Sequence, residues 1–234
     1  LKIVEKNRAT VREKRLDSSV FKVGLIGYTN AGKSTIMNAL TNKSQYEADE
    51  LFATLDATTK SVNLTGRFNV TVTDTVGFIQ DLPTELVSSF KSTLEESKNV
   101  DLLVHVIDAS DPNHEEHEKT VLAIMKDLDM LDIPRLTLYN KADKAENFTP
   151  TLTPYALISA KNENSRAILQ NALLNKMREL FVPFRIKVSP SKAYKLHELE
   201  SLAIIDKREY LEESEMISGY IAEKNKWRLE EFYD

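Results

Sequence analysis

Residues 27–34, "GYTNAGKS", combine two glycines, a lysine and a serine at a spacing that suits phosphate binding. They fit G-x-x-x-x-G-K-[ST], after an apolar run at 20–27 and before a predicted helix at 33–42, which is the context the motif requires. Gly27 and Gly32 let the backbone curl, so that its N–H groups point at a phosphate. Lys33 would then reach the β/γ oxygens and Ser34 would ligate Mg²⁺. The flanking strand and helix argue against a chance glycine-rich turn.

A second motif, "DTVGF" at 74–78, follows the alternating run "FNVTVT". Asp74 closes this predicted strand, where its carboxylate can hold Mg²⁺ through a water, and the Gly77 N–H can meet the γ-phosphate. In many nucleotide hydrolases the next residue is a glutamine that orients the attacking water. Here it is Phe78, which cannot orient a water. We therefore expect another group to place the water if the chain is a hydrolase.

Two further motifs select the base. "NKAD" (140–143) follows the predicted strand 134–140, and "SAK" (159–161) ends the next one. Asp143 would accept hydrogen bonds from the guanine ring N1–H and the exocyclic amine, whereas adenine would leave the carboxylate unpaired. Asn140 would brace the site, the Lys141 stem would cover the base, and the Ala160 N–H would meet the guanine carbonyl oxygen. Because all these motifs follow strand C-termini, they together predict a GTP site.

The elements that position these motifs alternate along the chain. Strands are predicted at 20–27, 101–109, 134–140 and 155–159, a hairpin around Gly66 and Arg67, and helices at 33–42, 113–131 and 164–181. The run 101–109 is almost entirely apolar, as expected of a parallel strand covered on both faces. This order predicts an α/β fold of the P-loop NTPase type, a three-layer sandwich, over residues 20–182. The loop 43–60 must supply one more Mg²⁺ ligand, and Thr54, Thr58 and Thr59 remain open.

The two ends of the chain differ from this pattern. Residues 183–234 predict a small α+β appendage with a strand, a helix and two further strands. Residues 1–19 predict a polar helical linker, and residues 1–22 carry seven Lys/Arg against three acidic residues although the chain's net charge is −5. Such a basic helix could touch phosphate backbones or be merely solvated.

Composition excludes several classes of function. The chain has no cysteine, which rules out disulfides, thiolate metal sites and cysteine nucleophiles and suits a reducing cytosol. We expect no membrane span, since no run approaches about 18 apolar residues. His114 and His117, in "HEEH", are expected on a solvated helix rather than at a metal, and His105 in the core.

The strings "GYTNAGKST", "LFATLDATT", "DTVGFIQDLP", "DLLVHVIDASDP" and "NKAD" resemble the HflX family of the Obg–HflX GTPases, from about residue 20 to 182. The resemblance implies a cytoplasmic GTPase that binds the large ribosomal subunit and splits or rescues stalled ribosomes. Much of the ribosomal-RNA contact would come from an N-terminal domain, which we expect to be absent here, joined through the linker 1–19. We expect a monomer. The resemblance also assigns Thr54 as the switch threonine for Mg²⁺ and the γ-phosphate.

Asn30 suggests how hydrolysis could proceed beside Phe78. In related GTPases an asparagine here helps hold a K⁺ where an arginine finger would act, so we hypothesise K⁺ stimulation; the alternative is that Asn30 only stabilises the turn. The catalytic set is then Lys33, Asn30, Gly77 and Thr54, and the Mg²⁺ set is Ser34, Thr54 and Asp74. The residues expected to contact GTP or GDP are Gly27, Tyr28, Thr29, Asn30, Ala31, Gly32, Lys33, Ser34, Thr35, Thr54, Asp74, Gly77, Asn140, Lys141, Asp143, Ser159, Ala160 and Lys161.

The sequence also departs from the family pattern. Only "KAENFTPTLTP" separates NKAD from the next strand, so a helix common there in G domains is expected to be missing, and "NENS" after SAK lacks a glycine. Two other functions remain open. One is a nucleotide-gated binding module with negligible hydrolysis. The other is a GTPase of another RNA-processing assembly.

Overall fold

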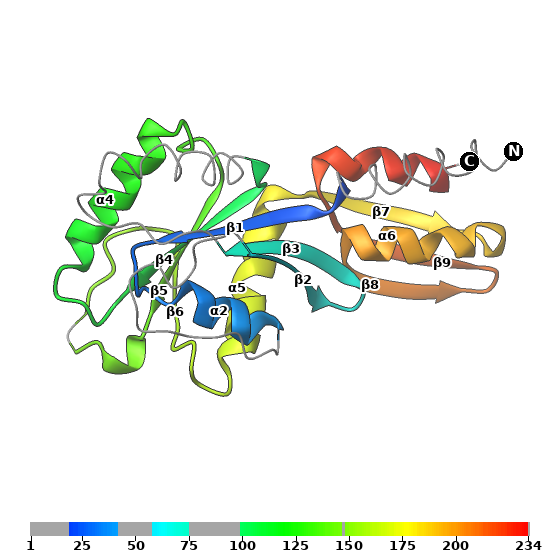
Figure 1. Ribbon diagram of the computed structural model, residues 1–234. Helices are drawn as coiled ribbons and strands as arrows, with labels where there is room; N and C mark the ends of the chain where they lie inside the picture. Colours follow the sequence, from blue (N-terminus) through cyan, green and yellow to red (C-terminus); the bar gives the residue numbers. More distant parts are fainter. Residues whose placement is uncertain (1–18, 42–57, 75–98, 147, 234) are drawn as a thin grey trace, which may run out of the picture. The chain divides into compact units, whose positions relative to one another are not determined.

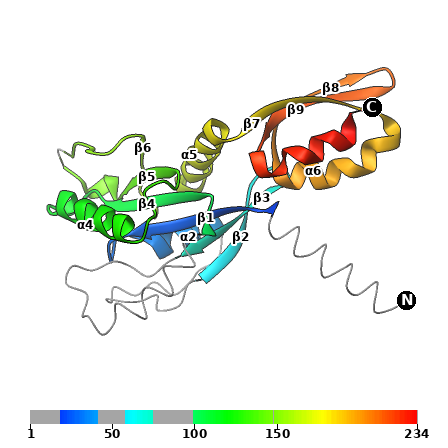
Figure 2. The same cartoon turned by 90° about the horizontal axis from the view of Figure 1, so that it is seen from above.

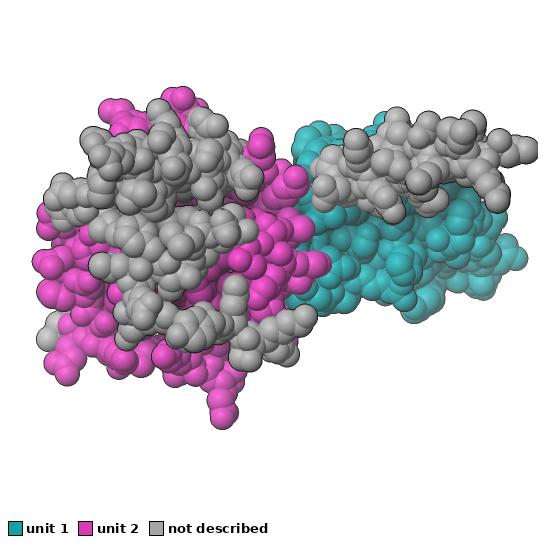
Figure 3. All heavy atoms as spheres, viewed as in Figure 1, with its two compact units in different colours: residues 1–21, 63–70, 174–234 teal, residues 22–62, 71–173 magenta. Residues whose placement is uncertain are grey.

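The computed structural model describes residues 19–41, 58–74, 99–146 and 148–233. The chain divides into two compact units, coloured separately in Figure 3. Unit 1 comprises residues 1–21, 63–70 and 174–234, and unit 2 comprises residues 22–62 and 71–173. The expected linker 1–19 lies outside the described residues except for Ser19.

Six of the described strands form one sheet in the order β2-β3-β1-β4-β5-β6 (Figure 1). Their bounds are Phe21–Gly27 for β1, Thr58–Thr65 for β2, Phe68–Asp74 for β3, Leu102–Asp108 for β4, Arg135–Asn140 for β5 and Tyr155–Leu157 for β6. The strands β1, β4, β5 and β6 pair in parallel. Because parallel strands all end at the same edge, the motifs that follow β1, β5 and β6 are brought together there.

The register across this sheet sets which motif residues are neighbours. Gly27 lies opposite Val106, and Asp108 lies opposite Asn140. The strand β4 is buried along almost its whole length, as its apolar sequence predicted. The strands β2 and β3 are joined by a turn in which Gly66 has a φ of 52°, which confirms the predicted hairpin.

Helices cover both faces of the sheet, which confirms the predicted three-layer α/β sandwich. Their bounds are Lys33–Thr41 for α2, His114–Asp127 for α4 and Ser165–Leu180 for α5. Figure 1 shows α2 and α4 on opposite sides of the strand β1. Val121 and Met125 of α4 are buried against Ile26 and Leu103 of the sheet. Truncating a buried side chain such as Met125 to alanine typically costs about 2–5 kcal/mol of stability.

The C-terminal residues form a second sheet within unit 1, in the order β7-β9-β8 (Figure 2). The elements are β7 Val182–Val188, the 3₁₀ helix η3 Pro190–Lys195, α6 Leu196–Leu202, β8 Ala203–Leu211, β9 Ser214–Ile221 and the 3₁₀ helix η4 Glu223–Phe232. Pairing is antiparallel throughout. Alternate residues of β7, including Phe184 and Ile186, pack with Leu229 and Phe232 of η4. This is the α+β arrangement predicted for the appendage. The strand β7 includes Pro183, which is tolerated because β7 lies at the edge of the sheet.

No helix in the described part of the chain is long and apolar enough to cross a membrane. The expected loss of a helix after NKAD is also seen. A short 3₁₀ helix, η2 Ala142–Lys144, is followed by chain without a described helix until β6.

Candidate nucleotide-binding site

The loop that joins β1 to α2 has the tight curvature expected of a phosphate-binding loop. Asn30 and Gly32 have positive φ angles of 59° and 97°. A Cβ at Gly27 would lie 2.3 Å from the Val106 carbonyl oxygen, and one at Gly32 would lie 2.2 Å from Asn140 Nδ2. Both glycines are therefore required because neighbouring groups approach the backbone too closely for a side chain.

Lys33 is folded back onto this loop. Its Nζ donates to the carbonyl oxygens of Gly27 at 3.2 Å and Tyr28 at 3.1 Å, and only 7% of the residue is exposed. Burial lowers the pKa of the Lys33 ammonium to about 8, although the nearby Asp74 carboxylate acts in the opposite direction. The lysine is thus held at the loop as a cation that is poorly solvated and would gain from an anionic ligand.

Ser34 and Asp74, the described residues of the predicted Mg²⁺ set, lie together. The Ser34 hydroxyl donates to Asp74 Oδ2 at 2.7 Å, while the buried Asp74 Oδ1 has no hydrogen-bond partner among the described residues. Burial raises the pKa of the Asp74 carboxyl, and the Ser34 hydrogen bond and Lys33 oppose that shift. An unpartnered carboxylate oxygen beside a hydroxyl suits Mg²⁺, which binds one or two protein oxygens and completes its shell with phosphates and waters.

Two other residues expected in this part of the site, Thr54 and Gly77, lie outside the described residues, as does Phe78. Within the described ranges no group of three or more His, Asp or Glu could hold a metal by itself. The prediction that "HEEH" is not a metal site stays a prediction. His117 instead stacks on Tyr28, with ring centroids 3.8 Å apart, and its Nδ1 lies 3.5 Å from Asp111 Oδ2.

Asn140 joins three segments of the site. Its Nδ2 donates to the Ala31 carbonyl oxygen at 3.0 Å, and its Oδ1 accepts from the Ala160 N–H, also at 3.0 Å. The side chain is buried, and these two hydrogen bonds give both its nitrogen and its oxygen a partner within the protein. Asn140 therefore links the phosphate loop to the segment after β6, and its role beside a bound nucleotide stays a prediction. The Ala160 N–H is bonded to Asn140, and its predicted bond to a guanine oxygen stays a prediction.

Lys141 crosses back to the phosphate loop. It has a positive φ of 59°, and its Nζ donates to the Asn30 carbonyl oxygen at 2.9 Å and to Asp108 Oδ2 at 2.7 Å. The other carboxylate oxygen of Asp108 accepts from the Ser110 N–H and hydroxyl at 3.0 and 2.6 Å. Sequence reasoning missed Asp108, although its place at the C-terminal end of the strand β4 was a usable signal.

Asp143 and Ser159 lie at the outer end of the site. The Asp143 N–H donates to Ser159 Oγ at 3.0 Å, and Asp143 is exposed. The Ser159 hydrogen bond lowers the pKa of the Asp143 carboxyl, which keeps it ionised and able to accept hydrogen bonds at neutral pH. Lys161 is exposed and Thr29 and Thr35 are half-buried, in the loop and helix positions predicted for them.

His105 is a core residue, as expected. It is 1% exposed on β4, and burial, assisted by Arg135 and Lys33, lowers its pKa to about 3. The ring is therefore neutral at physiological pH. Its Nδ1 has no hydrogen-bond partner among the described residues, so the histidine is buried without being fully satisfied.

Comparison with known proteins identifies the family. Residues 22–141 match the family model described as 50S ribosome-binding GTPase. The chain belongs to this GTPase family. It is 42% identical over 227 residues to the GTPase HflX of Alkalihalophilus pseudofirmus, covering 95% of the chain and 54% of that protein. It is 43% identical over 152 residues to the GTPase HflX of Escherichia coli, covering 65% and 36%. The resemblance to HflX GTPases is thus confirmed, and the chain spans about half the length or less of these curated relatives.

A solved structure has the same fold as this chain. A GTP-binding protein from Sulfolobus solfataricus, crystallised in complex with GDP, superposes with a TM-score of 0.54 and 26% identity, covering 73% of this chain and 57% of that one. This GTPase-family chain therefore has the P-loop G-domain fold, and that neighbour binds GDP.

Proposed function

We propose that the chain binds GTP and GDP with Mg²⁺ and hydrolyses GTP to GDP and phosphate. The observation that carries the proposal is the Asn140 amide, which ties the phosphate loop at Ala31 to the base-side loop at Ala160. Beside it, the exposed and ionised Asp143 carboxylate can accept from both guanine donors. Adenine offers neither donor, so guanine is the base that this site would select.

The residues at the phosphate loop have separable tasks. Lys33 would pair with the β/γ oxygens, to which its partly desolvated charge is strongly attracted. Ser34 and Asp74 would hold Mg²⁺, and Thr54 is the further ligand that the resemblance assigns. The bound ion supplies charge neutralisation on the phosphate oxygens. The positive φ angles of Asn30 and Gly32 would let backbone N–H groups of the loop point at the phosphates.

The attacking water must be placed without a glutamine at position 78. Asn30 supports two interpretations. Its positive φ of 59° is a conformation that asparagine tolerates well, which favours a role in the turn. We also propose that its side chain holds a K⁺ at the phosphates. Turnover is then faster in KCl than in NaCl at matched ionic strength, and Asn30→Gly, which keeps the turn, removes that difference. Equal rates in the two salts would exclude the K⁺ role.

We further propose that the whole protein acts in the cytoplasm as a monomer on the large ribosomal subunit and its RNA, in splitting or rescue of ribosomes. The proposal is supported by the HflX relatives and by the description of the matched family as 50S ribosome-binding. The basic residues of 1–22 give it a segment that could reach RNA phosphates. A region N-terminal to this chain would provide most of the RNA contact.

Multiple-turnover hydrolysis of GTP, with and without large ribosomal subunits, tests these proposals. We expect slow turnover alone and at least about tenfold faster turnover with the subunit, since ordering of the switch segments by a partner is a common source of activation. Lys33→Ala should be inactive in both conditions. Phe78 favours one rival, a nucleotide-gated binding module. Nucleotide-dependent co-sedimentation with the subunit but no hydrolysis above the Lys33→Ala background would establish that rival instead.

A further inference from the structure

The Tyr139 hydroxyl is the centre of a polar cluster next to the guanine motif. Tyr139 immediately precedes Asn140 on β5 and is fully buried. Its hydroxyl oxygen accepts the backbone N–H groups of Thr151 at 3.1 Å and Leu152 at 2.9 Å. It also lies 3.1 Å from Thr151 Oγ1. One side chain therefore fixes the segment that replaces the missing helix after NKAD.

The direction of each hydrogen bond in this cluster follows from the donors available. Thr151 Oγ1 donates to Glu118 Oε2 on α4. The Thr151 oxygen is then free to accept, so the Tyr139 hydroxyl donates to it. Tyr139 thus uses its one proton and both lone pairs, which is the full capacity of a phenol. A fully used hydroxyl in the interior is a specific arrangement that packing alone does not require.

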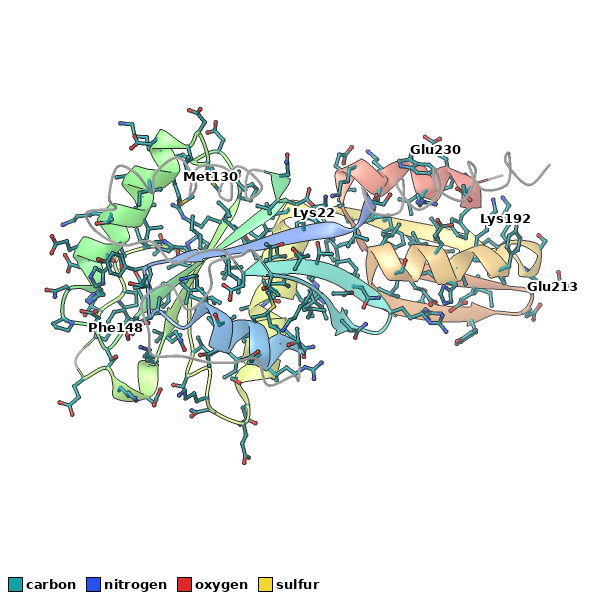
Figure 4. All side chains as sticks on the ribbon, in the orientation of Figure 1. Lys22, Met130, Phe148, Lys192, Glu213 and Glu230 are labelled. Carbon is teal, nitrogen blue, oxygen red and sulfur yellow. The ribbon has the colours of Figure 1, made fainter. Side chains whose placement is uncertain are left out.

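The backbone and ring of Tyr139 fix the other side of the same loop. Its carbonyl oxygen accepts the Ile158 N–H at 2.9 Å, and the Ile158 carbonyl accepts the Ala142 N–H at 3.1 Å. Phe148, labelled in Figure 4, packs on the Tyr139 ring with centroids 4.8 Å apart. The residues that recognise the base are therefore held between two segments, and both are bonded to Tyr139.

A phenylalanine at 139 would fill the same space and keep the ring contacts. It would leave the part-buried N–H groups of Thr151 and Leu152 without that acceptor, and each lost hydrogen bond costs about 0.5–1.5 kcal/mol unless the segment moves to another partner. The segment is short, and its described residues between η2 and β6 include no helix that could hold it. The movement would be transmitted to residues 140–143, because Tyr139 is covalently joined to Asn140 and η2 begins two residues later.

We propose that Tyr139, together with Thr151 and Glu118, positions the base-recognising loop and so sets the preference for guanine over bases that lack its exocyclic amine. These are positioning residues, since the proposal assigns them no contact with the nucleotide. The inference rests on the proposed guanine-nucleotide binding. It concerns how well the Asp143 carboxylate can accept from the ring N1–H and the exocyclic amine of guanine at the same time. A small displacement of the carboxylate weakens the contact with the exocyclic amine first.

The test compares Kd for GDP and for inosine diphosphate, which lacks the exocyclic amine, in wild type and in Tyr139→Phe. Tyr210→Phe is the matched control, because Tyr210 is 80% exposed and belongs to unit 1. We expect Tyr139→Phe to weaken GDP about tenfold and inosine diphosphate less than about threefold, so that the preference falls, as loss of a polar contact predicts. The Tyr210→Phe preference should equal that of wild type.

Thr151 gives a second pair of variants if Tyr139→Phe folds poorly. Thr151→Val removes the link to Glu118 and should lower the preference, whereas Thr151→Ser keeps the hydroxyl and should restore it. If both GDP and inosine diphosphate weaken by the same factor, the hydroxyl supports only general stability and the inference is overturned. An unchanged preference in Tyr139→Phe and Thr151→Val overturns it as well. If wild type itself shows no preference for guanine nucleotides, the proposed function fails first.

Discussion

The buried Lys33 ammonium leads to a pH dependence of nucleotide binding. In the free chain the pKa of Lys33 is lowered to about 8, chiefly by burial. A polyphosphate at the loop would raise that pKa again, because an adjacent negative charge favours the protonated amine. Binding must therefore take up a proton wherever free Lys33 is partly neutral, and affinity must fall as pH rises through 8.

The magnitude follows from the fraction of free Lys33 that is charged. With a pKa of about 8 in the free chain, roughly three quarters of Lys33 is charged at pH 7.5 and roughly a tenth at pH 9. If only the charged form binds well, GDP affinity drops by about eightfold across that interval. At pH 8 itself, binding should take up about half a proton.

Titration calorimetry of GDP in two buffers of different ionisation enthalpy measures both quantities. Lys33→Met is the control, because protons exchanged by the nucleotide itself are still measured with this variant. It is titrated at protein concentrations above its weaker Kd for GDP. Proton uptake should be larger in wild type than in the variant, which retains only the nucleotide's own contribution. An affinity that is flat from pH 7.5 to pH 9, or an uptake equal in both proteins, would refute the reasoning.

The same shift predicts the stability of the nucleotide-free chain. The folded pKa of about 8 lies below the ordinary lysine value of 10.5, so the unfolded chain binds more protons between these values. Stability should then rise with pH across this window. The full difference is about 3 kcal/mol. Denaturant unfolding at pH 7.5 and pH 10, in wild type and Lys33→Met, should show the rise only in wild type.

Two further substitutions test the site. Gly32→Ala should lower the free energy of unfolding by about 2–3 kcal/mol and weaken GDP binding by about tenfold or more. A Cβ at this position would displace the Asn140 amide, and the positive φ is unfavourable for alanine. Denaturant unfolding and GDP titration measure the two effects, and a Kd for GDP within twofold of wild type would contradict the prediction. Asp74→Asn should leave the Tm of the nucleotide-free chain equal or higher, since burial already disfavours the charged carboxylate. The same substitution should raise the Mg²⁺ concentration needed for half-maximal GTP binding about tenfold. An unchanged Mg²⁺ requirement would show that Asp74 does not help to hold the ion.

Local patterns predicted the elements that carry the motifs. The apolar run at β4, the glycine turn at Gly66 and the phosphate loop each depend on residues close together in the sequence, so their structures could be predicted from local periodicity. The position of the motif "NKAD" at the C-terminal edge of the sheet could be predicted from the order of the strands alone. These features account for most of the fold and for the placement of Ser34, Asp74 and Asn140.

The contacts that sequence reasoning missed depend on register between distant segments. Asp108 binds Lys141 because β4 and β5 pair with a register that sets Asp108 beside Asn140, and that register is not encoded locally. The Tyr28–His117 stack and the Tyr139–Thr151 bond likewise join elements that only the folded chain brings together. Polar residues in such roles resemble ordinary surface or core residues when read in isolation.

The Asn140 amide gives the two halves of a bound nucleotide a common support. Its nitrogen holds the backbone next to the phosphates, and its oxygen holds the backbone next to the base. A substitution that removes this amide should therefore weaken the contacts to both halves of the nucleotide, although the phosphates and the base do not touch each other. Nucleotide exchange would then be fastest when a partner disturbs either half, because loosening one loop loosens the other.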